Sequence, residues 1–458
     1  MSHSLEHRSV VVIGAGITGL STAFALKRQG YEVTVLERAS RAGGVIQTFC
    51  DQGYLVEAGP NALLLDDPRL EELIEHAGLG AERVNASALA SKRFLVRSGR
   101  VIAAPSSLRE FVRSPLLSAR GKLRLLAEPF AAKGDPATDE SVTDFFRRRL
   151  GQEALDYGVN PLVGGVYAGD PNRLSMRQSF PRLYELEQTH GSLVRGGIES
   201  ARARRRIRPP RARPQTVSFR GGLGALVSAL ASILGADLLT GVELQEVASG
   251  PPFRVLFQQN GATPRELSAD SLIVTTPAYA SALLPLPSAR DALSALVSVE
   301  YPPLASVALG FARRDLTHAL DGFGVLVPEC ESLDILGALF TSSLFSGRAP
   351  QDHELLTSYV GGMRNPELAG LPEAELVQRV TASLQKLGVV KGDPAYQRVT
   401  RHRHAIPQYH LGFERVRAAL DTAQRRLPGL FFGGPMRGGA SVGDCIRSGL
   451  ELAARIAA

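Results

Sequence analysis

The 458-residue sequence is poor in the residues that build disulfide frameworks and metal centres. Its three cysteines, Cys50, Cys330 and Cys445, lie far apart and match no metal-ligand spacing. We therefore expect no metal, and buried thiols in a reducing compartment. The nine histidines form no triad or cluster either, and we expect His402 and His404 on a solvated face.

Long apolar segments are also missing. Residues 1–9 are polar and contain no apolar core of the kind found in secretory signals, so a cytoplasmic location is expected. The longest uncharged runs, residues 221–236 and 271–289, are shorter than a membrane span or are interrupted by prolines. Any membrane contact is therefore expected to be peripheral.

Positive charge exceeds negative charge by seven, and the excess is concentrated in seven arginines within residues 202–213, here called the arginine run. Such a run can contact nucleic acid or an anionic lipid surface. No aromatic residues are interleaved with it and no nucleic-acid fold signal accompanies it, so nucleic acid is not expected as a partner. A solvated loop and a lipid contact stay open as alternatives.

Residues 10–37 read VVVIGAGITGLSTAFALKRQGYEVTVLE, which is typical of a strand, a turn and a helix that bind a dinucleotide. Gly14 permits the tight turn, Gly16 lets a pyrophosphate approach the backbone, and Gly19 lets the helix pack on the strand. The helix N-terminus supplies free N–H groups for the phosphates. Glu37 ends the second strand and is placed to accept hydrogen bonds from ribose hydroxyls.

Elements of this kind recur further along the chain. Residues 217–234 read as a glycine turn and a helix, and strands follow at 241–247, 253–258 and 271–276. Residues 429–458 read as a strand, a glycine-rich turn and a helix with one apolar face. The sequence therefore predicts an α/β fold in which one Rossmann-like domain is built from three chain segments.

Two insertions separate those segments. Residues 109–199 are rich in helical patterns, with an amphipathic stretch at 142–155. Residues 278–399 predict an antiparallel sheet, with strand-like runs at 305–311, 333–340 and 355–360 and a helix at 373–387. We predict a cofactor domain from residues 1–85, 214–277 and 400–458, an α+β substrate domain from 86–108, 200–213 and 278–399, and a helical membrane-associating domain from 109–199.

The residues after Glu37 distinguish FAD from NAD. ERASRAGGVIQT and the later Glu57-Ala58-Gly59-Pro60 resemble the amine-oxidase-like flavoprotein superfamily, in which both segments wrap FAD. NAD dehydrogenases lack this continuation. The resemblance implies FAD as the cofactor.

Four further segments resemble the oxygen-dependent protoporphyrinogen oxidase family: VYAGDPNRLSMRQSFPRLYELEQTHGSL, DGFGVLVPECESLDILGALFTSSLF, HAIPQYHLGFERV and SVGDCIRSG. The resemblance runs from about residue 8 to residue 458. It implies a cofactor domain, a substrate domain and a helical membrane-binding domain. It also implies repeated two-electron oxidation of protoporphyrinogen IX to protoporphyrin IX in haem biosynthesis, with O2 as acceptor and hydrogen peroxide as by-product.

The resemblance also implies site residues. A tetrapyrrole is large and apolar but carries propionates, so it needs an apolar cavity with a cation at one edge. Arg93 matches the propionate-binding arginine, and the backbone carbonyl of Gly169 matches the catalytic acceptor of a pyrrole N–H. The positions that match residues facing the macrocycle are Phe323, Leu326, Leu339 and Tyr359.

Cofactor contacts are implied for three groups of residues. The N-terminal group is Gly14, Ala15, Gly16, Ile17, Thr18, Gly19, Glu37, Arg38, Arg41, Gly43, Gly44, Val45, Ile46, Gly59, Pro60, Asn61 and Ala62; the central group is Val242, Thr275 and Ile406; the C-terminal group is Ala440, Ser441, Val442, Gly443, Asp444 and Cys445. The last group would direct a helix N-terminus at the flavin N1 and O2. Asp444 is alternatively an ordinary first-turn carboxylate.

Alternative functions stay open. A coproporphyrinogen III oxidase would need more cations for four propionates. A non-catalytic flavin carrier is suggested by Gly443, which stands where many relatives carry asparagine, and an amine or carotenoid oxidase is the remaining enzyme alternative. The expected partners are the porphyrinogen, O2 and the cytoplasmic face of the membrane, with a homodimer and a hand-off to ferrochelatase left open.

Overall fold

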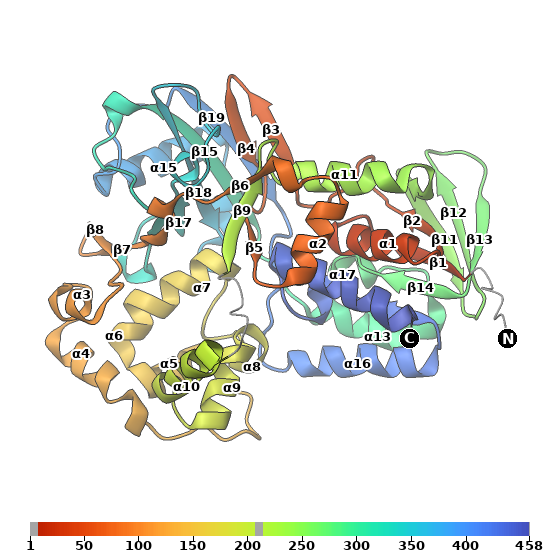
Figure 1. Ribbon diagram of the computed structural model, residues 1–458, viewed down its shortest axis with the longest axis horizontal. Helices are drawn as coiled ribbons and strands as arrows, with labels where there is room; N and C mark the ends of the chain where they lie inside the picture. The colour runs from red at the N-terminus through yellow and green to blue at the C-terminus, as the bar shows by residue number, and fades with distance from the viewer. Residues whose placement is uncertain (1–7, 207–213, 458) are drawn as a thin grey trace.

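The computed structural model describes residues 8–206 and 214–457, so residues 207–213 of the arginine run lie outside the described part. Figure 1 shows three regions: a parallel sheet with helices at the right, a second sheet at the upper left, and a group of helices at the lower left. The first described strand, β1 (Ser9–Ile13), and the last described helix, α17 (Val442–Ala457), both lie in the region of the parallel sheet.

The parallel sheet has five strands in the order β10-β2-β1-β14-β20. Alternate residues of each strand point to opposite faces, so Val10 and Val12 of β1 lie in one core while Val11 and Ile13 lie in another. The strands are β1 (Ser9–Ile13), β2 (Glu32–Leu36), β10 (Leu238–Leu239), β14 (Ser271–Val274) and β20 (Leu430–Phe432). The predicted α/β fold is confirmed, because these strands come from three separated parts of the chain.

Different elements cover the two faces of the parallel sheet. One core includes residues of α1 (Ile17–Arg28), α2 (Pro68–His76), α11 (Gly224–Leu234) and α17 (Val442–Ala457). The other includes residues of α13 (Arg290–Ala295), α16 (Phe413–Arg426) and the antiparallel strands β11 (Val242–Ala248), β12 (Phe253–Gln259) and β13 (Arg265–Ala269). The smaller elements nearby are β3 (Thr48–Asp51), β4 (Tyr54–Glu57), β5 (Leu63–Leu65), β6 (Arg83–Asn85), β9 (Gln215–Phe219) and α12 (Ala278–Ser281).

The second sheet has seven strands in the order β19-β15-β18-β17-β16-β7-β8. It is antiparallel, as the sequence predicts, except that β7 runs parallel to β16. The elements are β7 (Phe94–Arg97), β8 (Arg100–Ala103), β15 (Leu304–Ala312), β16 (Gly324–Leu326), β17 (Gly337–Leu339), β18 (His353–Gly361), β19 (Tyr396–His402), α14 (Thr341–Leu344) and α15 (Glu373–Lys386). The strand-like run at 333–340 holds only the short β17, because Ile335 and Leu336 are buried in a loop.

Residues 109–199 form helices, as the sequence predicts, but one predicted helix is interrupted. The stretch 142–155 is not one helix, because α5 ends at Leu150 and Gly151 takes φ +88°. A π-helix, η4 (Leu155–Val159), then leads into α7. The helices are α3 (Leu108–Arg113), α4 (Ala119–Leu126), α5 (Val142–Leu150), α6 (Gln152–Ala154), α7 (Asn160–Tyr167), α8 (Met176–Ser179), α9 (Pro181–His190) and α10 (Leu193–Arg206).

A buried ion cluster holds these helices together. Arg149 of α5 pairs with Glu128 at 3.1 Å and with Glu187 of α9 at 2.5 Å, and all three side chains are fully buried. Glu128 also accepts hydrogen bonds from Leu193 N and Val194 N at the start of α10. Within the described residues, no helix combines the length and the apolar character needed to cross a bilayer.

Candidate functional site

In the glycine turn after β1, two glycines lie so close to neighbouring atoms that a Cβ atom would clash. Gly14 takes φ +102°, and a Cβ on it would stand 2.9 Å from Thr276 Cγ2. A Cβ on Gly19 would stand 2.0 Å from the Gly14 carbonyl oxygen, so only glycine lets α1 pack this closely. Beside Gly16, by contrast, no atom lies within 4 Å of the Cβ position. The turn therefore has open space where a pyrophosphate would approach.

The start of α1 is suited to an anion. Gly16 caps the helix with no side-chain hydrogen bond, and the first turn carries no acidic residue. Thr275 Oγ1 donates toward the Ile13 and Gly14 carbonyls at 3.1 and 3.0 Å, which fixes the turn from β14. The first N–H groups of the helix are therefore left for phosphate oxygens.

Glu37 organises the same turn. Its carboxylate oxygens accept from Ala15 N and Ala39 N, both at 2.8 Å, and its carbonyl accepts from Val242 N at 2.9 Å. A carboxylate oxygen has two lone pairs, so each retains acceptor capacity for a ribose hydroxyl. The predicted ribose role is compatible with this geometry, and the backbone contacts are an additional role.

The loop after Glu37 folds back on the glycine turn. Arg41 donates to the carbonyl oxygens of Ala42, Gly44 and Ile46 at 2.8–3.3 Å. A Cβ on Gly44 would lie 3.6 Å from Gly16 Cα, so the two glycines are neighbours. Arg38 is exposed, and Val45 is 51% exposed, which is high for an apolar side chain.

The segment 59–62 lies between the two sheets. A Cβ on Gly59 would stand 2.5 Å from the Val45 carbonyl oxygen. Asn61 Nδ2 donates to Tyr359 OH at 2.6 Å and to Gly59 O at 3.1 Å. Asn61 Oδ1 is buried with no hydrogen-bond partner in the described chain, so an acceptor is left for a further group.

The N-terminus of α17 carries a capping box. Ser441 Oγ accepts from Asp444 N at 3.1 Å, and Asp444 Oδ2 accepts from Ser441 N at 3.3 Å. Arg447 binds both Asp444 and Asp66. Asp444 is therefore a first-turn capping carboxylate, the alternative left open by the sequence.

Cys445 follows this cap and is buried, and its burial raises the pKa of the thiol to about 12. Cys50 and Cys330 are exposed, so the expectation that all three thiols are buried is wrong for these two. Their surroundings come from tertiary contacts that the sequence spacing does not encode. Among the described residues, no three His, Cys, Asp or Glu side chains gather in a way that could hold a metal ion.

Three observations indicate that this site fits FAD. They are the space beside Gly16, the start of α1 without a side-chain cap, and Asn61 Oδ1 without a partner among the described residues. The remaining predicted cofactor residues lie around these groups or at the cap of α17. Ile406 packs near Tyr359, in a cluster formed by Ala168, Leu304 and Leu336.

The substrate residues predicted from the sequence are brought together on the second sheet. Leu326 pairs with Gly337, Gly337 pairs with Tyr359, and Leu339 pairs with Gly324. Directly paired residues point to the same side of a sheet, so Leu326, Leu339 and Tyr359 share one face. We call this the substrate face. The opposite face is buried against α15.

Helix α7 covers part of the substrate face. A Cβ on Gly165 would stand 2.3 Å from Leu326 Cδ2, so Leu326 packs directly against the backbone of α7. Leu162 and Val166 of the same helix are 41% and 52% exposed. The substrate face therefore has an apolar wall beside it.

Arg93 lies at the edge of the substrate face. Its guanidinium lies over the Phe323 ring, 5.1 Å from the centroid. It is exposed and has no carboxylate partner among the described residues, whereas its neighbour Lys92 pairs with Asp321. An exposed cation stacked on an aromatic ring is a suitable site for a propionate.

Gly169 follows α7 in a turn in which Ala168 takes φ +49°. A Cβ on Gly169 would stand 2.6 Å from Gln408 Oε1. Gln408 is 1% exposed, and its Nε2 donates to the carbonyl oxygens of Tyr167 and Ile406 at 2.9 and 3.0 Å. Among the described residues, no group donates to the Gly169 carbonyl, so this acceptor is free.

Two residues of this site were missed in the sequence. Gln408 joins the Gly169 turn to Ile406. His402 is half-buried rather than solvated, and its Nε2 lies 2.9 Å from the Ala58 carbonyl, to which it must donate. His404 is exposed and stacks on Tyr279. The only sequence signal for Gln408 is its place in the Ile-Pro-Gln-Tyr motif.

Comparison with known proteins identifies the family. The model of the flavin containing amine oxidoreductases matches residues 17–457. The chain is 33% identical to protoporphyrinogen oxidase 2, chloroplastic/mitochondrial, of Arabidopsis thaliana, in an alignment that covers 98% of this chain and 94% of that protein. It is 30% identical to coproporphyrinogen III oxidase of Bacillus subtilis (strain 168), covering 98% of this chain and 97% of that protein.

A solved structure has the same fold. The crystal structure of a candidate protoporphyrinogen oxidase from Exiguobacterium sp. 255-15 superposes with a TM-score of 0.80 at 24% identity, covering 99% of both chains. The chain is an oxidoreductase and its cofactor is FAD. It belongs to the flavin containing amine oxidoreductase family, in the group of the protoporphyrinogen and coproporphyrinogen III oxidases.

Proposed function

We propose that this chain oxidises protoporphyrinogen IX to protoporphyrin IX in haem biosynthesis, with O2 as acceptor and hydrogen peroxide as by-product. The observation that carries the proposal is the substrate face, where Leu326, Leu339 and Tyr359 lie together beside Arg93. The hydrogen bond from Asn61 to Tyr359 joins this face to the segment 59–62, which is predicted to contact FAD. A flat apolar macrocycle with propionates at one edge fits this arrangement.

FAD, when bound, would supply the acceptor for the hydride that leaves the substrate. The substrate face and α7 would hold the macrocycle and exclude water. Arg93 would bind a propionate through a charge-assisted hydrogen bond. The free Gly169 carbonyl would accept a pyrrole N–H, which raises the electron density of that pyrrole and so favours departure of a hydride from the adjacent methylene bridge.

The cations near the substrate face support protoporphyrinogen over coproporphyrinogen. Lys92 pairs with Asp321, and Arg97 pairs with Glu153 at 2.7 Å. Arg93 is left as the cation without a carboxylate partner among these three. Two propionates at one edge suit one such cation better than four propionates around the ring.

A fluorescence assay of porphyrin formation, run with protoporphyrinogen and coproporphyrinogen side by side, tests the proposal. We expect faster porphyrin formation from protoporphyrinogen, with stoichiometric release of peroxide. A higher kcat/KM for coproporphyrinogen would favour the alternative. Flavin absorbance without porphyrin formation from either substrate would favour a carrier.

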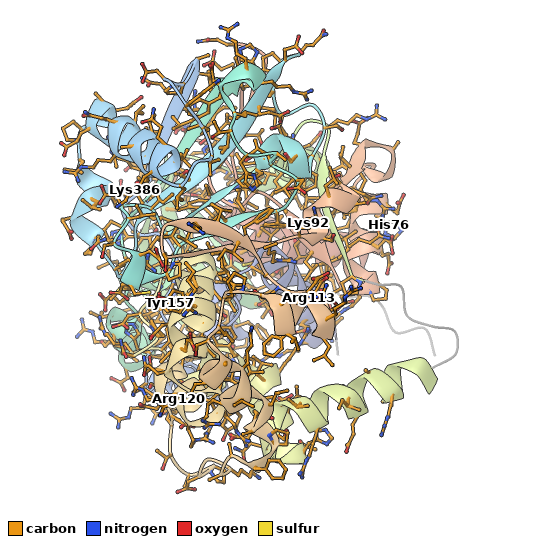
Figure 2. All side chains as sticks on the ribbon, turned by 90° about the vertical axis from the view of Figure 1, so that its left-hand side faces the viewer. His76, Lys92, Arg113, Arg120, Tyr157 and Lys386 are labelled. Atoms are coloured by element: carbon orange, nitrogen blue, oxygen red, sulfur yellow. The ribbon has the colours of Figure 1, made fainter. Side chains whose placement is uncertain are left out.

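We also propose that residues 108–130 and α10 dock on an anionic membrane surface at the cytoplasmic side. Leu108, Leu123 and Phe130 are 72%, 69% and 84% exposed. Arg113 and Arg120 lie among them in the sequence, and Figure 2 shows both on the face turned toward the viewer. Apolar side chains among basic ones are typical of interfacial binding. The homodimer and the hand-off to ferrochelatase stay predictions.

A further inference from the structure

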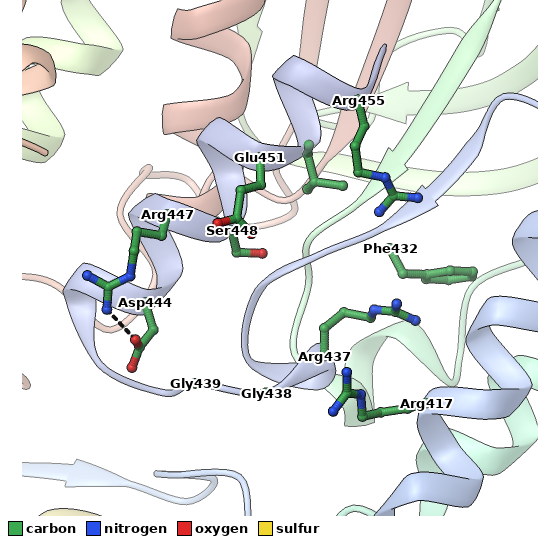
Figure 3. Close-up of a pocket in the computed structure, with 11 residues that line it drawn as sticks. Arg417, Phe432, Arg437, Gly438, Gly439, Asp444, Arg447, Ser448, Glu451 and Arg455 are labelled. Atoms are coloured by element: carbon green, nitrogen blue, oxygen red, sulfur yellow. Dashed lines mark hydrogen bonds and ion pairs between the residues drawn. The ribbon is translucent and has the colours of Figure 1, made fainter. Parts of the chain in front are cut away.

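A polar cleft of about 320 Å³ lies along the edge strand β20, away from the substrate face. Figure 3 shows α17 on one side of it and α16 on the other. Four arginines line the cleft: Arg417 from α16, Arg437 from the turn after β20, and Arg447 and Arg455 from α17. Four guanidinium groups around one small space repel each other unless anions lie between them.

The carboxylates of the chain balance only part of this charge. Arg437 Nη2 pairs with Asp421 at 2.6 Å, and Arg447 binds Asp66 and Asp444. Arg417 has only the neutral Gln178 amide, 3.2 Å from its Nη1.

Arg455 is exposed and lies over the Phe431 ring, 5.3 Å from its centroid. Within the described residues, Arg417 and Arg455 both lack a carboxylate partner. Glu451 also lines the cleft, but it lies 3.4 Å from Arg69. These two guanidinium groups are therefore left to pair with an added anion.

An arginine N–H group without an acceptor also indicates that the cleft binds an anion. Arg437 Nη1 is buried and has no hydrogen-bond partner in the described chain. A buried N–H group without an acceptor is destabilising, so such groups in proteins usually meet a bound molecule or ion. Ser448 Oγ, which accepts from Gly434 N at 2.9 Å, still has its own O–H to donate into the cleft.

We propose that this cleft binds a small multivalent anion carrying phosphate or carboxylate groups. Arg437 Nη1 and the guanidinium groups of Arg417 and Arg455 would donate to its oxygens. The cleft lies on a different face of α17 from the one that packs on α1, the helix capped by Gly16. Gly449 faces α1, with its Cβ position 2.6 Å from Thr18 O, whereas the exposed Glu451 and Arg455 line the cleft.

The test is calorimetric titration of the FAD-loaded protein with pyrophosphate in one arm and citrate in the other, at constant ionic strength. We expect one anion bound per chain, and at least tenfold weaker binding in both Arg417→Ala and Arg455→Ala. Both residues are exposed, so these variants should fold. Arg437→Gln is a third variant, and a retained flavin spectrum reports its folding.

Arg425→Ala is the matched control. Arg425 lies on α16 like Arg417, is exposed, and bonds only to Thr422 of its own helix, so its loss should leave binding unchanged. Binding of pyrophosphate alone identifies a phosphate site, and binding of citrate alone identifies a carboxylate site. Binding of neither anion, or equal weakening in Arg425→Ala and Arg455→Ala, would overturn the proposal.

Discussion

Two adjacent cations, Lys92 and Arg93, differ in what they are free to bind. Lys92 is engaged by Asp321, whereas Arg93 has only the Phe323 ring. An ion-paired lysine contributes little to a new anion, because binding would first break the existing pair. We therefore assign the proposed propionate contact to Arg93 and not to Lys92.

We expect Arg93→Ala to weaken protoporphyrinogen binding by about 1.5–3 kcal/mol, the worth of a charge-assisted hydrogen bond. Steady-state kinetics should show a raised KM with FAD fully retained. Lys92→Ala removes the same charge one residue away and should leave KM near the wild-type value. An equal rise of KM in Arg93→Ala and Lys92→Ala would indicate a general electrostatic effect instead of a specific contact.

Position 169 requires glycine because there is no room for a Cβ atom, and not because of its backbone conformation. A Cβ there would stand 2.6 Å from Gln408 Oε1. We expect Gly169→Ala to displace Gln408, break its hydrogen bonds to Tyr167 and Ile406, and lower kcat by roughly tenfold, the cost of one or two hydrogen bonds. Stopped-flow flavin reduction measures this step directly.

The double variant Gly169→Ala with Gln408→Ala tests whether the loss of kcat in Gly169→Ala comes from a steric clash with the Gln408 side chain. Removal of the amide creates room for the new methyl group, so the loss should be smaller than the sum of the two single losses. Strictly additive losses would contradict this account.

At the scale of elements, the helices of residues 109–199 depend on buried charge. Burial opposes ionisation of Glu187, but hydrogen bonds from Arg148 and Arg149 outweigh it and hold its pKa below the usual value. A depressed pKa stabilises the fold above the unfolded-state value of about 4.3, and this stabilisation is lost as pH falls below it.

Glu187→Gln should therefore lower the free energy of unfolding at pH 7 by about 3–5 kcal/mol, because it leaves Arg149 buried with one partner fewer. Urea denaturation followed by circular dichroism measures the difference. Wild type and variant should converge as the pH falls through 4. Glu185→Gln, an exposed carboxylate on the same helix, is the control and should change stability little. A pH-independent gap would count against ionisation of Glu187 as the cause.

The elements themselves were largely predictable, because their signals are local. The glycine turn, β15, β18 and α15 follow from periodicity and spacing within short stretches. Their contacts were not predictable in the same way. His402 meets Ala58 across 344 residues and Gln408 meets Tyr167 across 241, and no local pattern encodes such pairs. The face of each strand that meets the substrate was available only from the family resemblance.

At the scale of the whole molecule, the exposed apolar side chains near α4 predict a directional membrane contact. We expect Leu123→Glu to reduce co-sedimentation with vesicles containing anionic lipid by about tenfold. The substitution places a charged side chain where an apolar one would enter the lipid surface. Activity in detergent should be unchanged. Leu283→Glu is the control, since Leu283 is 79% exposed but lies before α13, beside the parallel sheet. Equal loss in both variants would contradict docking through residues 108–130.

The order of strands in the parallel sheet has a consequence for synthesis of the chain. Ser9, at the start of β1, contacts Asp270 across 261 residues, and β14 in turn pairs with β20 near the end of the sequence. During translation, β1 emerges first and its neighbour β2 follows soon after, but β14 on its other side is made much later and β20 later still. The nascent polypeptide therefore exposes an incomplete nucleotide-binding sheet until β14 and β20 have been made.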